Sequence, residues 1–538
     1  MSADVDVDIV VAGAGHNSLI AAAYLTRAGH RCRVLDARAG PGGGVATEEL
    51  LLPGYLIDSC STGHTLIQTN PLLVHDELGL VDEHGLTYLE PDPVAHVVFP
   101  DGASLTMWLD LERTCEELAR FSRADAAAYR RLLADYDAVK DVFAAQRFNP
   151  VGFGPSFEEM LADRRGAGGW KRRAAMSAWQ VVRHEFESRH AQAFMLWMAF
   201  QTGQPVDSAG SGPLAYSIVF GRQRRSWTIP QGGSGELIRA LVEVIVEGGG
   251  EILCDRRVVR LLLDAGRCVG VETDDGDVHL AREAVLSTIH VKDLVQMAPL
   301  EAWGEDFLYA IDTYDEGVAA FAAHYATTEP PRYPTSDGGE VTAVSAGVAG
   351  WPEDIVRMGR DVKEGRLVRD GAWLLFPCPT VADPSRAPSG RHTLKVLGMQ
   401  PYDPGGGSGA WEGLRAEIAE VHLRHLRRAA PNLVAERILA ELVVAPPDLE
   451  RANPHMWHGT FHGGDRSVPF SGPLRPAPDW AAHRMPIPGL YQTGGTTHPG
   501  GSVTGGPGRN AAIVMLRDLG ADLLEVMSIG RPASAGRH

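Results

Sequence analysis

The sequence predicts an α/β fold with more than one domain, and three features indicate it. Residues 8–12 are a short β-branched run that leads through a glycine turn into an apolar helix. Apolar residues recur at three- and four-residue spacing from 111 to 145, which predicts a separate helical region. Between 251 and 287, short strands alternate with turns. A chain of 538 residues exceeds what one hydrophobic core usually organises, so we expect two or three units.

The first strand, turn and helix have the pattern of a dinucleotide-binding βαβ unit. Gly13 and Gly15 would let backbone amides approach a pyrophosphate at the start of the helix, which Gly29 ends. Asp36 closes the next strand, 23 residues after Gly13, near the ~20-residue offset at which a carboxylate reaches a ribose hydroxyl. Ser18 replaces the third glycine of the fingerprint, so we expect a looser fit between helix and strand. The alternative is an ordinary turn between a strand and a helix.

Composition and charge exclude several classes of protein. Hydrophobic residues make up 44% and charged residues 22%, as in soluble globular proteins. The formal net charge of −18 repels phosphate backbones, so we do not expect a nucleic-acid partner. Six cysteines without a C-x-x-C pair favour buried thiols in a reducing compartment. The acidic N-terminus and the lack of an apolar run of ~18 residues predict a cytoplasmic protein.

A second glycine turn with an arginine, residues 37–44, follows Asp36, and a dense glycine region occupies 494–508 near the C-terminus. Together with residues 13–17, 45–49, 53–55, 58–59, 230–233 and 258–259, these segments resemble the flavin-containing amine oxidase and phytoene desaturase superfamily. The match is tighter with the phytoene-dehydrogenase-like branch that includes pyridine nucleotide-disulfide oxidoreductase domain-containing protein 2. The matching segments lie at both ends and in the centre, so the resemblance spans nearly the whole chain.

The resemblance implies a Rossmann-like FAD-binding domain of the glutathione-reductase type, joined to a substrate domain of mixed sheet and helices. The FAD-binding domain would be assembled from 1–90, 225–295 and 481–528. The substrate domain would comprise 91–224 and 296–480, and a disordered tail would follow at 529–538.

The same resemblance, together with the glycine turns, predicts the residues that contact FAD. Ser502 departs from the family, whose members often have a third glycine there. The expected cofactor residues are Gly13, Gly15, His16, Asn17, Ser18, Asp36, Ala37, Arg38, Gly43, Gly44, Val45, Val258, Gly494, Gly495, Pro499, Gly500, Gly501, Ser502 and Val503.

Histidines and aromatic residues are the candidates for catalysis and substrate binding. Candidate catalytic residues are His498, before the Pro-Gly-Gly turn, together with His462 and His64; candidate substrate contacts are Trp227, His455, Trp457 and His458. Alternatives stay open: His498 as a turn cap, His64 as a loop histidine, Trp227 as core, and the 453–464 segment as packing. We expect no metal, because Pro454 and Gly459 interrupt the helix that would bring the three histidines of that segment to one face.

These assignments predict an FAD-dependent oxidoreductase that dehydrogenates a carbon–carbon bond of a lipophilic or isoprenoid-like molecule by hydride transfer to flavin N5. Its partners would be that apolar substrate and an electron acceptor such as oxygen, a quinone or another carrier. The alternatives are an oxygen-using amine or alcohol oxidase, a flavin-dependent isomerase and a non-catalytic flavin-binding scaffold. The Arg-rich segment 164–173, expected as a solvated loop, leaves open a peripheral membrane contact beside the apolar helix 194–200. A homo-oligomer is also left open.

Overall fold

The β-branched run at the N-terminus forms the central strand of a seven-stranded sheet in the computed structural model, which describes residues 7–528. Five strands run parallel in the order β9-β2-β1-β12-β20, and β11 and β10 extend β12 as an antiparallel meander. Their bounds are β1 (Val7–Ala12), β2 (Cys32–Leu35), β9 (Glu251–Leu253), β10 (Val258–Asp264), β11 (Arg267–Thr273), β12 (Val278–Ser287) and β20 (Leu490–Gln492). The predicted tail, 529–538, lies outside the described residues.

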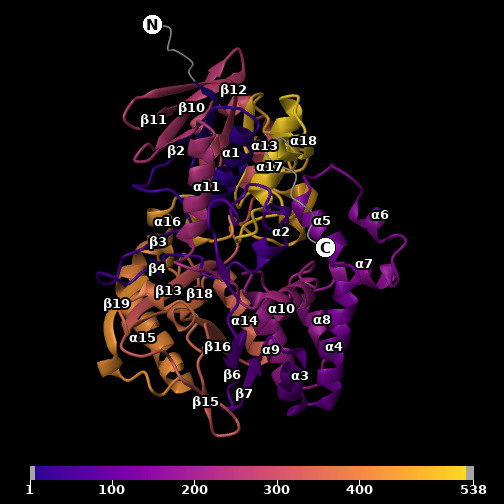
Figure 1. The fold of residues 1–538 in the computed structure, drawn as a ribbon, viewed down its shortest axis with the longest axis vertical. Helices are drawn as coiled ribbons and strands as arrows, with labels where there is room; N and C mark the ends of the chain where they lie inside the picture. Colours follow the sequence, from indigo (N-terminus) through magenta and orange to yellow (C-terminus); the bar gives the residue numbers. More distant parts are fainter. Residues whose placement is uncertain (1–6, 529–538) are drawn as a thin grey trace.

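Helices cover both faces of this sheet, in the upper half of Figure 1. Three helices, α1 (His16–Arg27), α11 (Gly235–Glu247) and α17 (Gly506–Asp518), pack their apolar side chains on one face. The helices α12 (Val291–Leu294) and α13 (Glu305–Asp312), with the β10–β11 meander, share the core on the other face. Helices on two faces of a mainly parallel sheet place ligands at the carboxyl ends of the strands.

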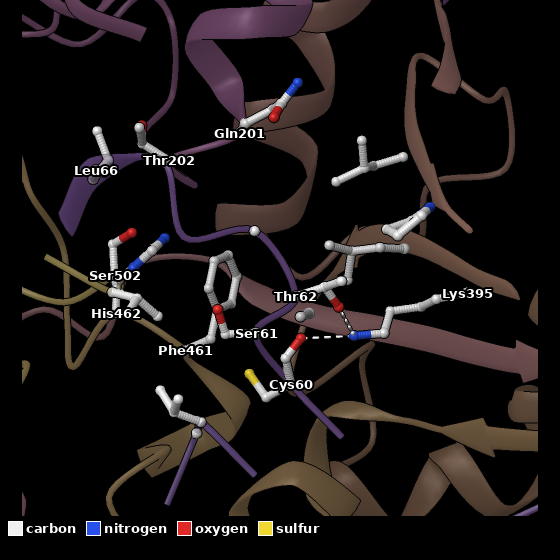
Figure 2. Close-up of a pocket in the computed structure, with 18 of the residues that line it drawn as sticks. Cys60, Ser61, Thr62, Leu66, Gln201, Thr202, Lys395, Phe461, His462 and Ser502 are labelled. Carbon is white, nitrogen blue, oxygen red and sulfur yellow. Dashed lines mark hydrogen bonds between the residues drawn. The ribbon is translucent and has the colours of Figure 1, made fainter. Parts of the chain in front are cut away.

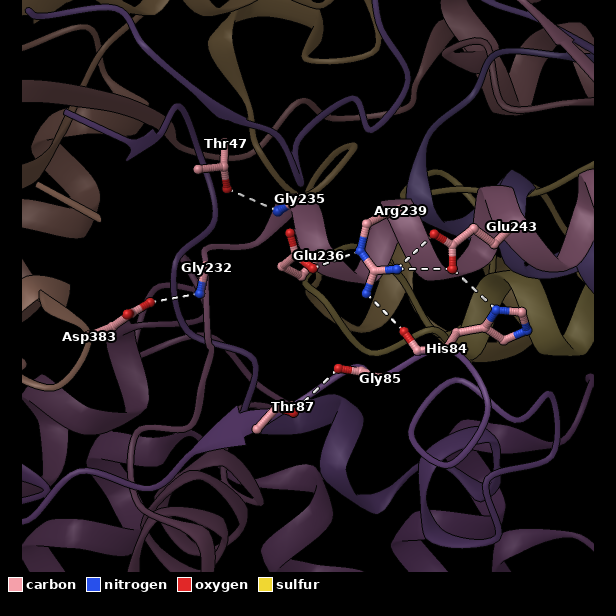
Figure 3. A network of polar contacts seen from close by, with 10 residues as sticks. All are labelled: Thr47, His84, Gly85, Thr87, Gly232, Gly235, Glu236, Arg239, Glu243 and Asp383. Carbon is pink, nitrogen blue, oxygen red and sulfur yellow. Dashed lines mark hydrogen bonds and ion pairs between the residues drawn. The ribbon is translucent and has the colours of Figure 1, made fainter. Parts of the chain in front are cut away.

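The start of α11 is tied to two distant segments (Figure 3). The amide of Gly235 donates to Thr47 Oγ1 at 2.9 Å, and the amide of Gly232 donates to Asp383 at 2.7 Å. Gly233 has φ +114°, and a Cβ there would lie 2.4 Å from Thr47 Oγ1. The glycines at the start of α11 therefore permit close packing of this helix on Thr47, and Gly232 adds a contact to the segment 378–391.

A second seven-stranded sheet forms the lower left of Figure 1. Its order is β19-β13-β18-β17-β16-β6-β7, and all neighbours are antiparallel except β16 and β6. One face packs on α15 (Trp411–Ala429). The strands are β6 (Ala95–Val98), β7 (Ser104–Met107), β13 (Ala319–Thr327), β16 (Ser345–Ala349), β17 (Trp373–Pro377), β18 (His392–Gln400) and β19 (Ile438–Val444).

Helices α3 to α10 lie beside this sheet, and they include the helical region expected from 111 onward. Their bounds are α3 (Leu111–Ala119), α4 (Arg123–Asp137), α5 (Lys140–Phe148), α6 (Phe157–Leu161), α7 (Ala167–Ala175), α8 (Ala178–Glu185), α9 (Arg189–Phe200) and α10 (Leu214–Arg225). The expectation of a loop at 164–173 was wrong: most of this segment belongs to α7, because Trp170 is buried against Tyr136, Phe143 and Tyr216.

The apolar run of α9 is core. Residues 193–200 are at most 1% exposed, and the indole of Trp197 donates to the carbonyl of Leu374 in β17. This run is therefore not available as a membrane face. Within residues 7–528, no helix combines the length and hydropathy that crossing a bilayer requires.

The remaining strands and α-helices of the described chain are mostly short. They are β3 (Thr47–Glu48), β4 (Ile57–Asp58), α2 (Pro71–Val74), β5 (Tyr88–Leu89), β8 (Ile229–Pro230), β14 (Tyr333–Pro334), β15 (Glu340–Val341), α14 (Pro352–Lys363), α16 (Pro446–Ala452) and α18 (Leu523–Ser528). Four of the six cysteines are buried, whereas Cys60 and Cys254 are partly exposed.

Candidate active site

Two adjoining cavities lie between the two sheets. The strand-end cavity, of about 400 Å³, follows the carboxyl ends of β1, β2 and β12. The inner cavity, of about 200 Å³, lies between these ends and the second sheet. Both are lined by His16, Gly44, Met456, Phe461 and Ser502. A molecule in the strand-end cavity therefore presents one end to the inner cavity.

The first glycine turn forms the floor of the strand-end cavity. Gly13 has φ +101°, and a Cβ there would lie 2.4 Å from Cγ2 of Thr288. A Cβ at Gly15 would meet no atom within 4 Å, because Gly15 borders the cavity at the N-terminus of α1. The first turn of α1 has no acidic residue, so its free amides and dipole favour an anion there.

Ser18 closes the same turn from behind. It is fully buried, and its hydroxyl donates to the carbonyls of Gly13 at 2.5 Å and Gly15 at 2.9 Å. The serine thus braces the turn in place of the fingerprint's third glycine, and it does not line the cavity.

Asp36 stands at the carboxyl end of β2, facing the strand-end cavity. Its two oxygens accept the amides of Ala14 at 2.6 Å and Arg38 at 2.8 Å, and burial raises the pKa of its carboxyl. Each oxygen keeps a second lone pair for a ribose hydroxyl. The Arg38 guanidinium spans the second glycine turn, donating to the Gly43 carbonyl and to Glu48, both at 2.9 Å.

Arg475 holds the opposite wall of the strand-end cavity. It is 1% exposed, and its guanidinium donates to five backbone carbonyls, those of His462, Gly463, Asp465, Phe470 and Gly495. These carbonyls belong to two loops, 462–470 and 494–501, and the second loop lines the cavity. A single buried cation therefore fixes the position of both loops.

The histidines at this wall are neutral at pH 7. Burial lowers the pKa of His16 and of His455 to about 4. The Nε2 atom of His455 accepts the amide of Gly495 at 3.2 Å, which a neutral ring can do.

Ser502, beside His16, has φ +84°, a left-handed conformation that favours glycine and that explains the frequent glycine of the resembling family.

Most of the expected cofactor residues line the strand-end cavity. They are Gly13, Gly15, His16, Asn17, Asp36, Ala37, Arg38, Gly43, Gly44, Val258, Gly494, Gly495, Gly501 and Ser502. Val45 and Val503 line the inner cavity instead, whereas Ser18, Pro499 and Gly500 line neither. Thr288 also lines this cavity and was not among the expected residues, although it follows β12 at the edge where parallel strands place ligands.

These residues fit a dinucleotide. The glycine turn offers a cradle that Cβ atoms would fill, the helix terminus offers an anion site, and Asp36 offers a hydroxyl acceptor. The Oδ1 atom of Asn17 and the Nε2 atom of His16 are buried at this cavity and have no hydrogen-bond partner within residues 7–528.

The inner cavity has a mainly apolar wall. Ala320 and Ala322 of β13, Leu397 of β18 and Ile218 of α10 contribute to it, and the Trp227 ring packs over Gly63. In Figure 2, His462 and Ser502 lie on one side of this cavity and Lys395 on the other. No Asp or Glu of the described residues lines it.

Two buried cations that the sequence did not predict, Lys395 and Arg222, also line the inner cavity. Lys395 of β18 donates to the Cys60 carbonyl at 2.7 Å and to the Thr62 hydroxyl at 3.4 Å. Arg222 of α10 donates to Gln201 and is 5% exposed. For Lys395, the sequence offered one signal, a single lysine inside the apolar run of β18.

The candidate catalytic and substrate residues divide among several places. His462 and Trp227 line the inner cavity, and His455 lines the strand-end cavity. Both ring nitrogens of His462 are buried without a partner among the described residues, and burial holds its pKa well below the ordinary value. The other candidates, His498, His64, Trp457 and His458, line neither cavity.

Each residue outside the cavities has another contact. The Nε2 atom of His498 is 2.8 Å from the Gln146 carbonyl, and the Nδ1 atom of His64 is 3.3 Å from the Tyr88 hydroxyl. His458 pairs with Glu316 at 2.6 Å and stacks on Trp457. Within residues 7–528, no group of three His, Cys, Asp or Glu side chains is arranged to hold a metal ion.

Sequence comparisons identify the family of this chain as one of flavin-containing proteins. The model of the family "flavin containing amine oxidoreductase" matches residues 19–509. One component of the limonene dehydrogenase of Castellaniella defragrans is 27% identical, covering 96% of this chain and 95% of its own. Mouse pyridine nucleotide-disulfide oxidoreductase domain-containing protein 2 is 27% identical, covering 96% and 94%. A lycopene-forming phytoene desaturase of Pseudescherichia vulneris is 25% identical, covering 95% and 99%.

Solved structures confirm the predicted fold class. An oxidoreductase from Methanosarcina mazei has a TM-score of 0.57 at 18% identity, covering 95% of this chain and 100% of its own. A cofactor-redesigned triple mutant of putrescine oxidase has a TM-score of 0.62 at 14% identity, covering 97% and 99%. The α/β architecture, with a Rossmann-like FAD-binding domain and a substrate domain, is shared with these proteins.

Proposed function

Because the chain belongs to the flavin containing amine oxidoreductases, with FAD as its cofactor, we propose that it removes two hydrogens across a carbon–carbon bond of a lipophilic small molecule. An electron acceptor completes the reaction. The observation that carries the proposal is the inner cavity, whose apolar wall adjoins the cofactor site through five shared residues. Such a wall binds apolar substrates by removing their surface from water.

Residues from both ends of the chain would bind FAD. The glycine turn and the N-terminus of α1 would take the diphosphate, and Asp36 the ribose next to the adenine. Gly494, Gly501 and Ser502 would lie along the flavin end, where the two cavities meet. When bound there, FAD supplies a two-electron acceptor that takes hydrogen as hydride.

The protein's own residues then exclude water and hold a proton. Met456 and Phe461 stand at the junction of the cavities, where their bulk keeps solvent from the reacting carbon. His462 is the proposed base, since it is neutral at pH 7 and its ring nitrogens have no partner within the described residues. It would accept the second hydrogen of the substrate as a proton on one ring nitrogen.

The names of the relatives support a lipophilic substrate. Limonene, phytoene and zeta-carotene, for which three of them are named, are hydrocarbons without an amine or a hydroxyl group. A protonated amine would find no carboxylate in the described part of the inner cavity and would face two buried cations.

The test is anaerobic mixing of the FAD-loaded protein with limonene, phytoene and, for comparison, benzylamine and benzyl alcohol. We expect the visible flavin band to bleach with a lipophilic compound that carries no amine or alcohol group, and mass spectrometry to show product lighter by two hydrogens. Bleaching by benzylamine alone, with peroxide released on reoxidation, would establish an amine oxidase instead. A product of unchanged mass would indicate an isomerase. A flavin that can be reduced chemically and reoxidised, but that no compound bleaches, would favour a scaffold.

A further inference from the structure

Arg222 is an exception among the buried arginines. Of the four that are buried within residues 7–528, Arg386 pairs with Asp58 at 2.8 Å, Arg509 pairs with Glu77 at 2.8 Å, and Arg475 binds five carbonyls. Among the described residues, Arg222 has neither a carboxylate partner in an ion pair nor a backbone carbonyl partner. Buried charges in proteins are normally paired, so this guanidinium calls for a physical explanation.

The contacts of Arg222 leave most of its donors unused. One terminal nitrogen donates to the side-chain oxygen of Gln201, and the other lies 3.7 Å from the sulfur of Met198. The guanidinium carbon lies 5.5 Å from the centre of the Trp227 ring. Both acceptors are neutral, and a guanidinium has five N–H donors in a planar fork. Burial lowers the pKa of Arg222 to about 9, so it remains charged at pH 7.

Lys395 adds a second positive charge to the lining of the inner cavity. Its ammonium donates to the neutral oxygens of Cys60 and Thr62 (Figure 2), which leaves one of its three donors. The nearby carboxylate of Asp58 is already paired with Arg386 at 2.8 Å. The inner cavity is therefore electropositive, in a chain whose formal net charge is −18.

We propose that Arg222 is the anchor for a carboxylate group on the substrate, supported by the charge of Lys395. This inference rests on the proposed function and narrows its substrate class to amphipathic carboxylic acids, molecules with an apolar body and one acidic end. The planar fork of Arg222 matches a carboxylate with two parallel hydrogen bonds. The apolar wall of β13 and β18 would hold the body beside the flavin end of the cavity.

The test measures binding, not turnover. Decanoate, methyl decanoate and decylamine are titrated into the FAD-loaded protein at pH 7.5, and Kd is read from the flavin difference spectrum and from tryptophan fluorescence. We expect decanoate to bind at least tenfold more tightly than its methyl ester, a difference of about 1.4 kcal/mol, and decylamine to bind least. Arg222→Gln should abolish the preference for the acid, Arg222→Lys should keep part of it, and Lys395→Met should reduce it.

Arg189→Gln is the matched control, because Arg189 also stacks on a tryptophan, Trp351, at 4.5 Å but lines neither cavity. It should keep the full preference. Equal affinity of the wild-type protein for acid and ester, or a preference that survives in Arg222→Gln, would overturn the proposal. If Arg222→Gln fails to fold, Arg222→Lys takes its place, and an undiminished preference for the acid in that variant would also overturn the proposal. A preference for the acid without dehydrogenation of any carboxylate would instead count against the proposed function.

Discussion

Replacing Arg475 by methionine should loosen the wall that we propose holds the flavin end of the cofactor. The substitution keeps much of the side chain's length but removes a charge that donates to five buried carbonyls. Four of these carbonyls belong to the loop that includes His462, and the fifth is that of Gly495 in the cofactor wall. Without the guanidinium, these hydrogen bonds no longer join the two loops.

The expected magnitude follows from these contacts. A hydrogen bond to a charged group is worth about 1.5–3 kcal/mol, and such bonds around one group are far from additive, so we expect a loss of about 3–5 kcal/mol in unfolding free energy. If about 2–3 kcal/mol of this loss falls on the arrangement of the loops that binds FAD, FAD binds about 30- to 150-fold more weakly.

The assay is titration of FAD fluorescence for the Kd, with Tm measured in the presence and absence of FAD. Arg484→Met is the control, because Arg484 forms an exposed two-point pair with Asp518 at 2.7 Å, and surface pairs contribute about 0–1 kcal/mol. Arg475→Lys keeps the charge with three donors and should fall between the two. FAD affinity within threefold of wild type in Arg475→Met would refute the reasoning, whatever happens to Tm.

Three further predictions concern the turn, the histidines and the proposed base. Gly13→Ala should weaken FAD binding by tenfold or more, since φ +101° strains alanine and its Cβ meets Thr288; Thr288→Ser should restore part of the affinity, as titration of FAD would show. Lowering the pH from 6.5 to 4 should lower Tm in a thermal melt series. Burial lowers the pKa of His498 to about 4, so the unfolded chain binds more protons than the folded chain over this range. For one such histidine, the loss in unfolding free energy is on the order of 3 kcal/mol. A Tm that stays level over this range would contradict that sign. His462→Gln should slow flavin reduction by a substrate found in the mixing test by about 100-fold or more, whereas His498→Gln should leave the rate within a few-fold, measured by anaerobic stopped flow.

The cofactor side of the site could be predicted from the sequence because its signals are local. The β1 strand, the turn at Gly13 and the acid at Asp36 lie within 30 consecutive residues, and each occupies the position that its spacing predicts. Ser18 shows the limit of this reasoning. Its type indicated a looser turn, whereas its buried hydroxyl braces the turn through two carbonyls, which only the folded geometry reveals.

The inner cavity could not be predicted because it is assembled over long sequence distances. Arg222 of α10 and Lys395 of β18 line one cavity although they lie 173 positions apart in the sequence. Histidines in loops illustrate the same difficulty. His462 and His498 both lie in glycine-rich segments, and the backbone of each loop decides that one ring enters the cavity while the other meets the carbonyl of Gln146.

The charge in the inner cavity bears on substrate choice more directly than the family name does. An ammonium group inside an apolar wall would meet the positive charges of Arg222 and Lys395 with no carboxylate of the described wall to offset them. Two like charges about 4 Å apart repel by about 4 kcal/mol at an effective dielectric constant of ~20, and a carboxylate at the same place gains a similar amount. Most of this energy difference between an ammonium and a carboxylate would appear in the binding free energy, because both groups lose comparable hydration when they enter the cavity. A fold shared with amine oxidases is thus compatible with a site that rejects protonated amines, and the sign of the charge facing the substrate separates the two chemistries.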